Sequence, residues 1–378
     1  METYKLSDLC EILDAKRKPL SALQRAKKQG IYPYYGAQGI IDHLDEYLLD
    51  GEYLLVAEDG ANLETRNQPI ANIAKGKIWV NNHAHVLGSN GKCPLNLLGF
   101  ILNNMNISPY VTGCAQPKLN QENLRNIEIE LPSHIDSIAS ILSSLDRKIE
   151  LNNKINADLE EMVQAIFKNW FVDFEPFKDG KFVDSELGMI PEGWKVVVFD
   201  NILKVTTTKT GKEGIPEYSV TNTGIQPRDE KFTKNLSKSS AKNKLIRKGN
   251  LVFGMSREIL NWGIMKEEVG GVSSAYNVYI VDEKIVNTTY LECFIAQRMD
   301  YFADLIKPAS REGQGVDKAL LMKKIICIPP SEVMDVFLEK YNSIMHLTEI
   351  RNQENSRLSL LRDTLLPRLM SGELEIPE

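Results

Sequence analysis

Apolar residues recur at helical spacing over two long stretches of the chain. The first covers residues 135–172, where apolar positions alternate in steps of four and three, beginning at Ile138 and Leu142. Two places on this stripe hold asparagines, Asn152 and Asn156. The spacing predicts a helix of about 50 Å or more at ~1.5 Å per residue, with a polar layer in its middle.

The second stretch covers residues 332–370 and repeats the pattern, with a polar interruption at 353–357. We predict that the two helices pair antiparallel as a coiled coil. The predicted pairing positions are Leu142, Leu145, Ile149, Asn152, Asn156 and Leu159 in the first helix, and Ile344, Leu347, Leu358, Leu361 and Leu365 in the second. An alternative is that each stripe packs only on its own domain.

Three short segments recur at an offset just under two hundred residues, which indicates an internal duplication. The matching pairs are GIYPYY at 30–35 with GIPEY at 214–218, DGEYLLV at 50–56 with KGNLVFG at 248–254, and NIEIELP at 126–132 with KIICIPP at 324–330. A predicted long helix follows the last member of each series.

The order of elements is therefore globule, long helix, globule, long helix. We expect an α+β protein with two mixed α/β globules, separated by the two helices and related by a pseudo-two-fold repeat. The expected domains are residues 1–134, a helix at 135–174, a linker and second globule at 175–331, and a helix with a tail at 332–378.

Composition places the chain among ordinary folded proteins, since 43% of its residues are hydrophobic and 25% are charged. The first twenty residues lack an apolar run, which argues against a signal peptide. No stretch reaches the length of a membrane span, so we expect no membrane partner. The five scattered cysteines suggest neither a zinc cage nor a disulfide framework and fit a reducing cytoplasm.

The net charge is −6, whereas proteins that bind DNA alone are usually basic. Two local runs are nevertheless basic, one in each globule. They contain Lys16, Arg17, Lys18, Arg25, Lys27 and Lys28 in the first, and Lys231, Lys234, Lys238, Lys242, Lys244, Arg247 and Lys248 in the second. Each run is either a solvated surface or a set of phosphate contacts.

Five segments, taken in their order along the chain, are similar to one family. They are NNHAHVL at 81–87, TGCAQPKLN at 112–120, AIFKNWFVDF at 165–174, LGMIPEGW at 187–194 and LLPRLMSGEL at 365–374. The chain resembles the specificity subunits of type I restriction-modification systems over essentially all of its length. The second globule departs from the pattern, because it reads REGQGVDK at 311–318 where a second QPKLN would fall.

The resemblance implies a non-catalytic, sequence-specific subunit with two target recognition domains. Its partners would be double-stranded DNA, two modification (methyltransferase) subunits and, through them, restriction subunits. The methyl donor and ATP would belong to those partners, so no cofactor is expected here. Because the two globules differ greatly in their polar loops, we predict that the DNA site is split and asymmetric.

Amide, guanidinium and imidazole side chains in loops are candidates for reading base edges, since Asn or Gln pairs with adenine and Arg with guanine. The remaining DNA-binding candidates are Gln38, Asn62, Arg66, Asn81, Asn82, His83, His85, Gln116 and Lys118 in the first globule, and Arg257, Asn261, Asn277, Arg311 and Gln314 in the second. His83 and His85 could share a metal, but no Cys or carboxylate cluster accompanies them, and we predict no metal site.

Two other functions compete with DNA recognition. One is a stand-alone coiled-coil adaptor or structural protein without DNA specificity. The other is an enzyme such as a nuclease, although the sequence has neither a glycine-rich cofactor loop nor a phosphate loop ending in Gly-Lys-Ser or Gly-Lys-Thr.

Overall fold

The computed structural model describes residues 2–113, 116–132, 134–228, 236, 239–256, 259–306 and 316–374. The chain divides into two compact units, each built from two separate segments. Unit 1 comprises residues 1–154 and 351–378, and unit 2 comprises residues 155–350. Both long helices cross from one unit to the other. Each unit therefore includes a part of both long helices.

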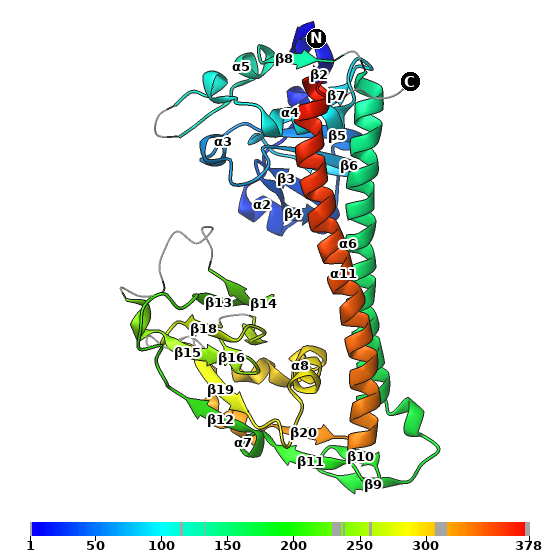
Figure 1. Ribbon diagram of the computed structural model, residues 1–378, viewed down its shortest axis with the longest axis vertical. Coiled ribbons are helices and arrows are strands. Elements are labelled where there is room, and N and C mark those ends of the chain that lie inside the picture. Colours follow the sequence, from blue (N-terminus) through cyan, green and yellow to red (C-terminus); the bar gives the residue numbers. More distant parts are fainter. Residues whose placement is uncertain are drawn as a thin grey trace. The chain divides into compact units, whose positions relative to one another are not determined.

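Unit 1 contains a six-stranded sheet in the order β2-β7-β5-β6-β3-β4, together with the separate antiparallel pair β1–β8 (Figure 1). All neighbouring strands are antiparallel except β3 and β6. The strands are β1 (Glu2–Lys5), β2 (Cys10–Ile12), β3 (Gln29–Gly36), β4 (Gly39–Leu44), β5 (Leu49–Ala57), β6 (Ala71–Val80), β7 (Ala84–Ser89) and β8 (Glu128–Leu131). The helices before the long one are α1 (Leu6–Leu9), η1 (Asp14–Lys16), α2 (Ala22–Ala26), α3 (Asn62–Thr65), α4 (Leu95–Asn104), η2 (Ser108–Tyr110) and α5 (Gln121–Arg125).

The central strand β5 is buried on both faces, because successive side chains of a strand point to opposite sides of the sheet. Leu54 and Val56 join the core that α4 and the long helices cover. Leu55 joins the core on the other face, with Ile78 and Val86. The apolar run at the end of this strand is explained by its place between β7 and β6.

Unit 2 contains a four-stranded sheet in the order β12-β19-β16-β17 and four two-stranded pairs, β10–β9, β11–β20, β13–β14 and β15–β18. The strands are β9 (Phe182–Ser185), β10 (Gly188–Pro191), β11 (Lys195–Val198), β12 (Leu203–Thr206), β13 (Tyr218–Thr221), β14 (Gly224–Pro227), β15 (Lys244–Arg247), β16 (Leu251–Phe253), β17 (Trp262–Ile264), β18 (Val269–Val272), β19 (Asn277–Val281) and β20 (Ile325–Ile328). The helices before the second long one are η3 (Glu175–Phe177), α7 (Phe199–Ile202), η4 (Ser240–Lys242), α8 (Thr288–Gln297), α9 (Met299–Phe302), η5 (Ala303–Leu305) and α10 (Lys318–Lys323).

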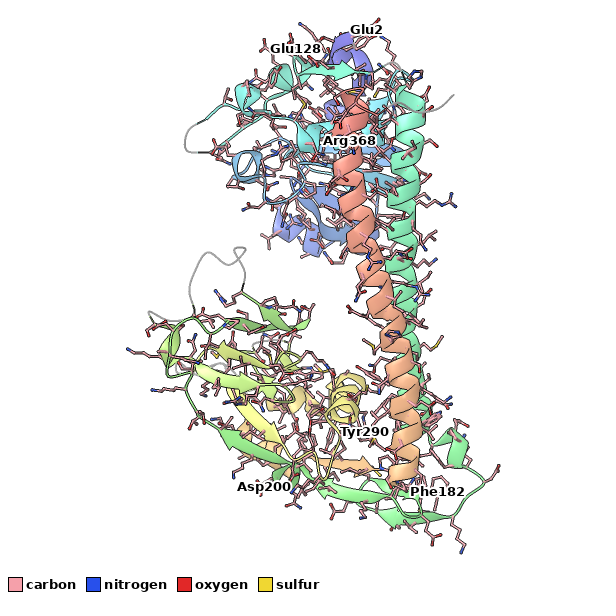
Figure 2. The ribbon with its side chains drawn as sticks, in the orientation of Figure 1. Glu2, Glu128, Phe182, Asp200, Tyr290 and Arg368 are labelled. Atoms are coloured by element: carbon pink, nitrogen blue, oxygen red, sulfur yellow. The ribbon has the colours of Figure 1, made fainter. Side chains whose placement is uncertain are left out.

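The core of unit 2 is rich in aromatic rings. Tyr290 of α8, labelled in Figure 2, packs edge-on against Phe171 with their ring centroids 5.0 Å apart. Its hydroxyl donates to the carbonyl oxygen of Cys327 at 2.5 Å, so this buried polar group is satisfied. The second long helix joins the same cluster through Phe337, which contacts Phe167 and Phe171.

The two long helices, α6 (Ile135–Phe171) and α11 (Ser331–Met370), begin and end within one residue of the predicted bounds. Within unit 1 they run antiparallel, since Asp146 accepts from Arg362 at 2.8 Å, while Asn152 donates to Glu354 at 2.8 Å and to Asn355 at 2.9 Å. The predicted polar layer is thus a set of hydrogen bonds between the helices. Of the described residues, no helix is both long and apolar enough to cross a membrane.

The stripe on α11 differs from the prediction at two positions. Leu347 and Leu361 are 43% and 45% exposed. Thr348, one residue further along, is buried in place of Leu347, and Arg362 in place of Leu361 bonds to α6. The inward positions include polar residues, which is why the spacing of apolar residues pointed to the neighbouring leucines instead.

Candidate nucleic-acid interface

The two motif segments of unit 1 that carry histidine and lysine meet around a buried ion cluster. His85 projects from β7 and is fully buried. Its Nδ1 lies 2.6 Å from an Asp14 oxygen, and its Nε2 lies 2.7 Å from the carbonyl oxygen of Leu119. Both ring nitrogens therefore face acceptor oxygens, so the ring lies between a carboxylate and a backbone carbonyl.

Asp14 is the acceptor at the centre of this cluster. It also accepts from the backbone N–H of Val86 at 2.9 Å and from the Gln121 amide at 3.0 Å. Burial alone raises the pKa of Asp14, but the hydrogen bond and charge of His85, the bond from Val86 and the charge of Arg17 outweigh it and leave the pKa below its ordinary value. Asp14 is thus held as a carboxylate.

Glu58, just after β5, forms a second acidic centre beside the first. It accepts from Arg17 at 2.5 Å and pairs with Lys118 at 3.1 Å. Burial raises the pKa of Glu58, yet the hydrogen bonds from Arg17 and Lys118 lower it further than burial raises it. Arg17 also donates to the Ala84 carbonyl, so its guanidinium ties this centre to the start of β7.

The segment 116–120 is fastened over the cluster, and we call it the strap. Backbone bonds run from Leu119 N–H to the Glu58 carbonyl at 2.8 Å and from Gly60 N–H to the Pro117 carbonyl at 3.1 Å. Lys118 exchanges two backbone bonds with Thr112, at 2.7 and 2.8 Å. The strap then leads into α5, whose first turn Asn120 caps by accepting from the Asn123 N–H.

Several predicted DNA-binding residues of unit 1 have exposed side chains. Asn82 and His83 lie in the turn before β7, where His83 pairs with Asp59 at 2.7 Å. The others with exposed side chains are Lys16, Lys18, Lys27, Gln38, Gln116 and Lys118. Of these, Lys118 is paired with Glu58, and Lys18 lies over the Trp79 ring with its Nζ 6.0 Å from the ring centroid. These side chains form the accessible polar rim of unit 1.

Other predicted residues of unit 1 are committed to internal contacts. Asn62 is buried and bonds to the backbone of Gln68, and Arg66 donates to three carbonyls at the end of α4. Asn81 is buried and accepts from the N–H of His83. Like His85, these side chains are bonded within the fold of unit 1.

Ion pairs within unit 1 engage half of the first basic run. Arg17 bonds to Asp14 and Glu58, Arg25 to Asp42 at 2.8 Å, and Lys28 to Glu46 at 2.7 Å. Lys16, Lys18 and Lys27 are the residues of this run with exposed side chains.

In unit 2, the described candidates divide in the same way. Lys242 is exposed, whereas Lys244 donates to the Tyr276 carbonyl at 2.6 Å, and burial lowers the pKa of Lys244. Asn261 donates to the Met255 carbonyl, and Asn277 is buried in β19. The remaining candidates lie outside the described residues: Lys231, Lys234, Lys238, Arg257, Arg311 and Gln314.

Sequence reasoning missed the carboxylates of the site, Asp14, Glu58 and Asp59, and the Gln121 amide that donates to Asp14. Carboxylates do not donate to DNA, so they were not among the predicted residues. A usable signal was the position of Glu58 and Asp59, which directly follow the buried apolar end of β5.

Other chemistry finds little support in the described parts of the chain. There, no group of three or more His, Cys, Asp or Glu side chains is placed to hold a metal ion. Cys10, Cys93, Cys293 and Cys327 are buried, and burial raises the pKa of each thiol to about 12, so these thiols are protonated at neutral pH.

Comparison with known proteins gives a consistent answer. Residues 1–161 match the family described as the type I restriction modification DNA specificity domain. The chain is 30% identical over 289 residues to the type I restriction enzyme MjaIX specificity subunit of Methanocaldococcus jannaschii. The aligned region covers 70% of this chain and 65% of that protein.

It is also 26% identical to the putative type I restriction enzyme specificity subunit S.HindORF215P of Haemophilus influenzae, over 97% of this chain and 95% of that protein. The fold matches the crystal structure of a type I restriction-modification S subunit from M. genitalium with a TM-score of 0.54 and 12% identity, covering 100% of this chain and 96% of that one. Over nearly its whole length, the chain is similar to the specificity subunits of type I restriction-modification systems.

Proposed function

We propose that this chain is the non-catalytic subunit that selects the DNA sequence for a type I restriction-modification complex, with each unit reading one part of a split, asymmetric site. The observation that carries the proposal is a shared frame. In unit 1 the sheet order β2-β7-β5-β6 stands beside the pair β1–β8, and in unit 2 the order β12-β19-β16-β17 stands beside the pair β11–β20.

The positions of these elements along the chain support an internal duplication. β1 begins at residue 2 and β11 at 195, while α4 begins at 95 and α8 at 288, so both pairs differ by 193 residues. The loops on the two frames have different sequences. Two related frames with unlike polar loops are what reading two different half-sites requires.

The antiparallel pairing of α6 and α11 as a coiled coil belongs to the same proposal, with the helices as the place where two modification subunits bind. Restriction subunits would join through them, and the complex would work on DNA in the cytoplasm. Support comes from apolar side chains that remain exposed on the unit 2 parts of both helices: Ile155, Met162, Val336, Leu347 and Ile350.

Methylome sequencing tests the proposal most directly. A host that expresses this chain with the modification subunit of its system should gain methylation at one split motif, and omitting this chain should abolish it. The purified chain incubated with Mg²⁺ and plasmid should leave the DNA intact. A complex that methylates without this chain, or a chain that binds no duplex DNA with its partners, would contradict the proposal and favour the adaptor alternative.

A further inference from the structure

The buried His85 cluster links the fold of unit 1 to its exposed polar rim. Gln116 and Lys118 are the exposed side chains of the strap, and both belong to the predicted DNA-binding set. His85 holds the strap from beneath through the Leu119 carbonyl. A change at His85 is therefore transmitted to side chains that it does not itself touch.

We propose that His85 is a positioning residue, which fixes the strap in the conformation that lets unit 1 read its half of the DNA site. This inference rests on the proposed function and assigns a role to a side chain that is too buried to contact DNA itself.

The geometry explains why a histidine is needed at this point. Its ring bridges a carboxylate 2.6 Å away on one side and a backbone carbonyl 2.7 Å away on the other. The two ring nitrogens lie on opposite sides of one rigid group, so a single side chain reaches both acceptors. A side chain whose donors sit at one end only can satisfy one acceptor and leaves the other without a donor, at a cost to the buried group.

Charge on the neighbouring elements keeps this bridge in place. The groups that face the ring are Asp14 from η1 and Glu58 after β5, whose oxygen lies 3.8 Å from Nδ1. Arg17 and Lys118 neutralise Glu58, and Gln121 of α5 donates to Asp14. Gln121, which directly follows the strap, therefore bonds to the same Asp14 carboxylate that orients His85.

The backbone bonds of the strap to Glu58, Gly60 and Thr112 fix its course near residues 117–119. They do not replace the His85 contact, because they approach from β5 and from residue 112, whereas His85 approaches from β7. Without the contact from His85 to the Leu119 carbonyl, the strap should rotate about its backbone bond to Glu58. Gln116 and Lys118 should then move with it.

The test compares two variants that break the bridge in different ways. His85→Gln keeps a polar side chain but cannot span both acceptors. Asp14→Asn keeps an oxygen acceptor beside Nδ1 but removes the carboxylate charge at that end of the bridge, so the contact that orients the ring is weakened. Each variant is expressed with the modification subunit, and the methylated motif is sequenced.

Val86→Ala serves as the matched control. Val86 is the next residue of β7, is fully buried on the opposite face of the sheet, and has no side-chain link to the strap. The Tm of the Val86→Ala variant should fall, while the methylated DNA motif should stay unchanged. The half-site read by unit 2 is an internal control within every sample.

We expect both bridge variants to lose at least about tenfold in discrimination at one or more positions of a single half-site, while the other half-site keeps its letters. Folded variants that keep both half-sites unchanged would overturn the proposal, and so would relaxation of both halves alike. If His85→Gln does not fold, Asp14→Asn and Gln121→Leu carry the same comparison. A wild-type chain that directs no methylation at all would instead contradict the proposed function.

Discussion

At the scale of single residues, acidic partners determine which basic and polar side chains of unit 1 are available. Arg17 was predicted to contact phosphate, but Asp14 and Glu58 engage it, and His85 is enclosed by the same carboxylates. Lys16 and Lys18 on either side of Arg17 remain exposed. Within one basic run, therefore, one residue forms internal ion pairs while its two neighbours face solvent, because the backbone directs each side chain differently.

Arg66 gives a prediction about stability. Its backbone is in the left-handed region (φ 54°), and one guanidinium nitrogen donates to the Leu102, Asn103 and Met105 carbonyls. These carbonyls are the unsatisfied end of α4, which a cation stabilises. Arg66→Ala should lower the free energy of unfolding by about 2 kcal/mol and leave the methylated motif unchanged. Denaturant unfolding measures the loss of stability, and the exposed Glu64→Ala variant is the control. A changed methylated motif would instead show that Arg66 takes part in reading DNA.

The ion cluster gives a prediction about pH. The pKa values of Asp14 and Glu58 are lowered from ordinary values of 3.8 and 4.5. Groups with a lowered pKa stabilise the fold fully above their ordinary values and lose this contribution as the pH falls through the folded-state values. The Tm difference between the wild type and Asp14→Asn should thus be constant from pH 7 to about pH 5 and shrink below about pH 4.

The exposed Asp184→Asn variant is the control for this measurement and should follow the wild-type Tm at every pH. A difference between the wild type and Asp14→Asn that stays constant down to pH 3 would show that the Asp14 carboxylate does not gain its stability from the His85 pair.

At the scale of elements, the long helices illustrate how periodicity locates a helix better than it locates a side chain. The bounds of α6 and α11 follow from the apolar repeat together with the prolines and glycines that flank them. The inward face of α11 depends on its partner as well. Asn355 and Arg362 occupy inward positions because Asn153 and Asp146 on α6 offer them partners.

The revised face of α11 gives a matched pair of variants. Ile344 is 9% exposed and joins the core of unit 2, whereas Leu347 is 43% exposed. Ile344→Ala should cost about 2–4 kcal/mol of stability, because it removes buried apolar surface and leaves a cavity. Leu347→Ala should cost less than about 1 kcal/mol. Urea unfolding of both variants decides the matter, and equal losses would restore Leu347 to the buried face.

At the scale of the whole molecule, the proposed function gives α6 the role of a ruler between two half-sites. Duplicating residues 157–160 adds four residues, which rotates the apolar stripe by only roughly 40°. The insertion lengthens the helix by about 6 Å, at ~1.5 Å per residue. Since B-DNA rises roughly 3.4 Å per base pair, the spacer should grow by about one or two base pairs.

Methylome sequencing of the insertion variant measures both the spacer and the letters of each half-site. The letters should stay as they are, because the insertion touches neither sheet. Altered letters, or an unaltered spacer in an active complex, would show that the helix does not set the spacing.

The sequence by itself determined the features that rest on local regularity or on short motifs. The two long helices, the alternation of globule and helix, and the family resemblance were all readable because periodicity and motif order survive without knowledge of contacts. The same reasoning found the segments at 81–87 and 112–120 that meet at the His85 cluster. It did not show that they meet.

Tertiary structure alone decided which polar side chains are buried and what they serve. Asn62, Arg66 and His85 were predicted to read bases, but burial places their partners in the backbone and in Asp14 instead. A buried polar group must find a partner within the fold, and that partner lies far away in sequence, as Asp14 lies 71 residues from His85. Local pattern therefore cannot separate a donor that faces DNA from one that holds the protein together.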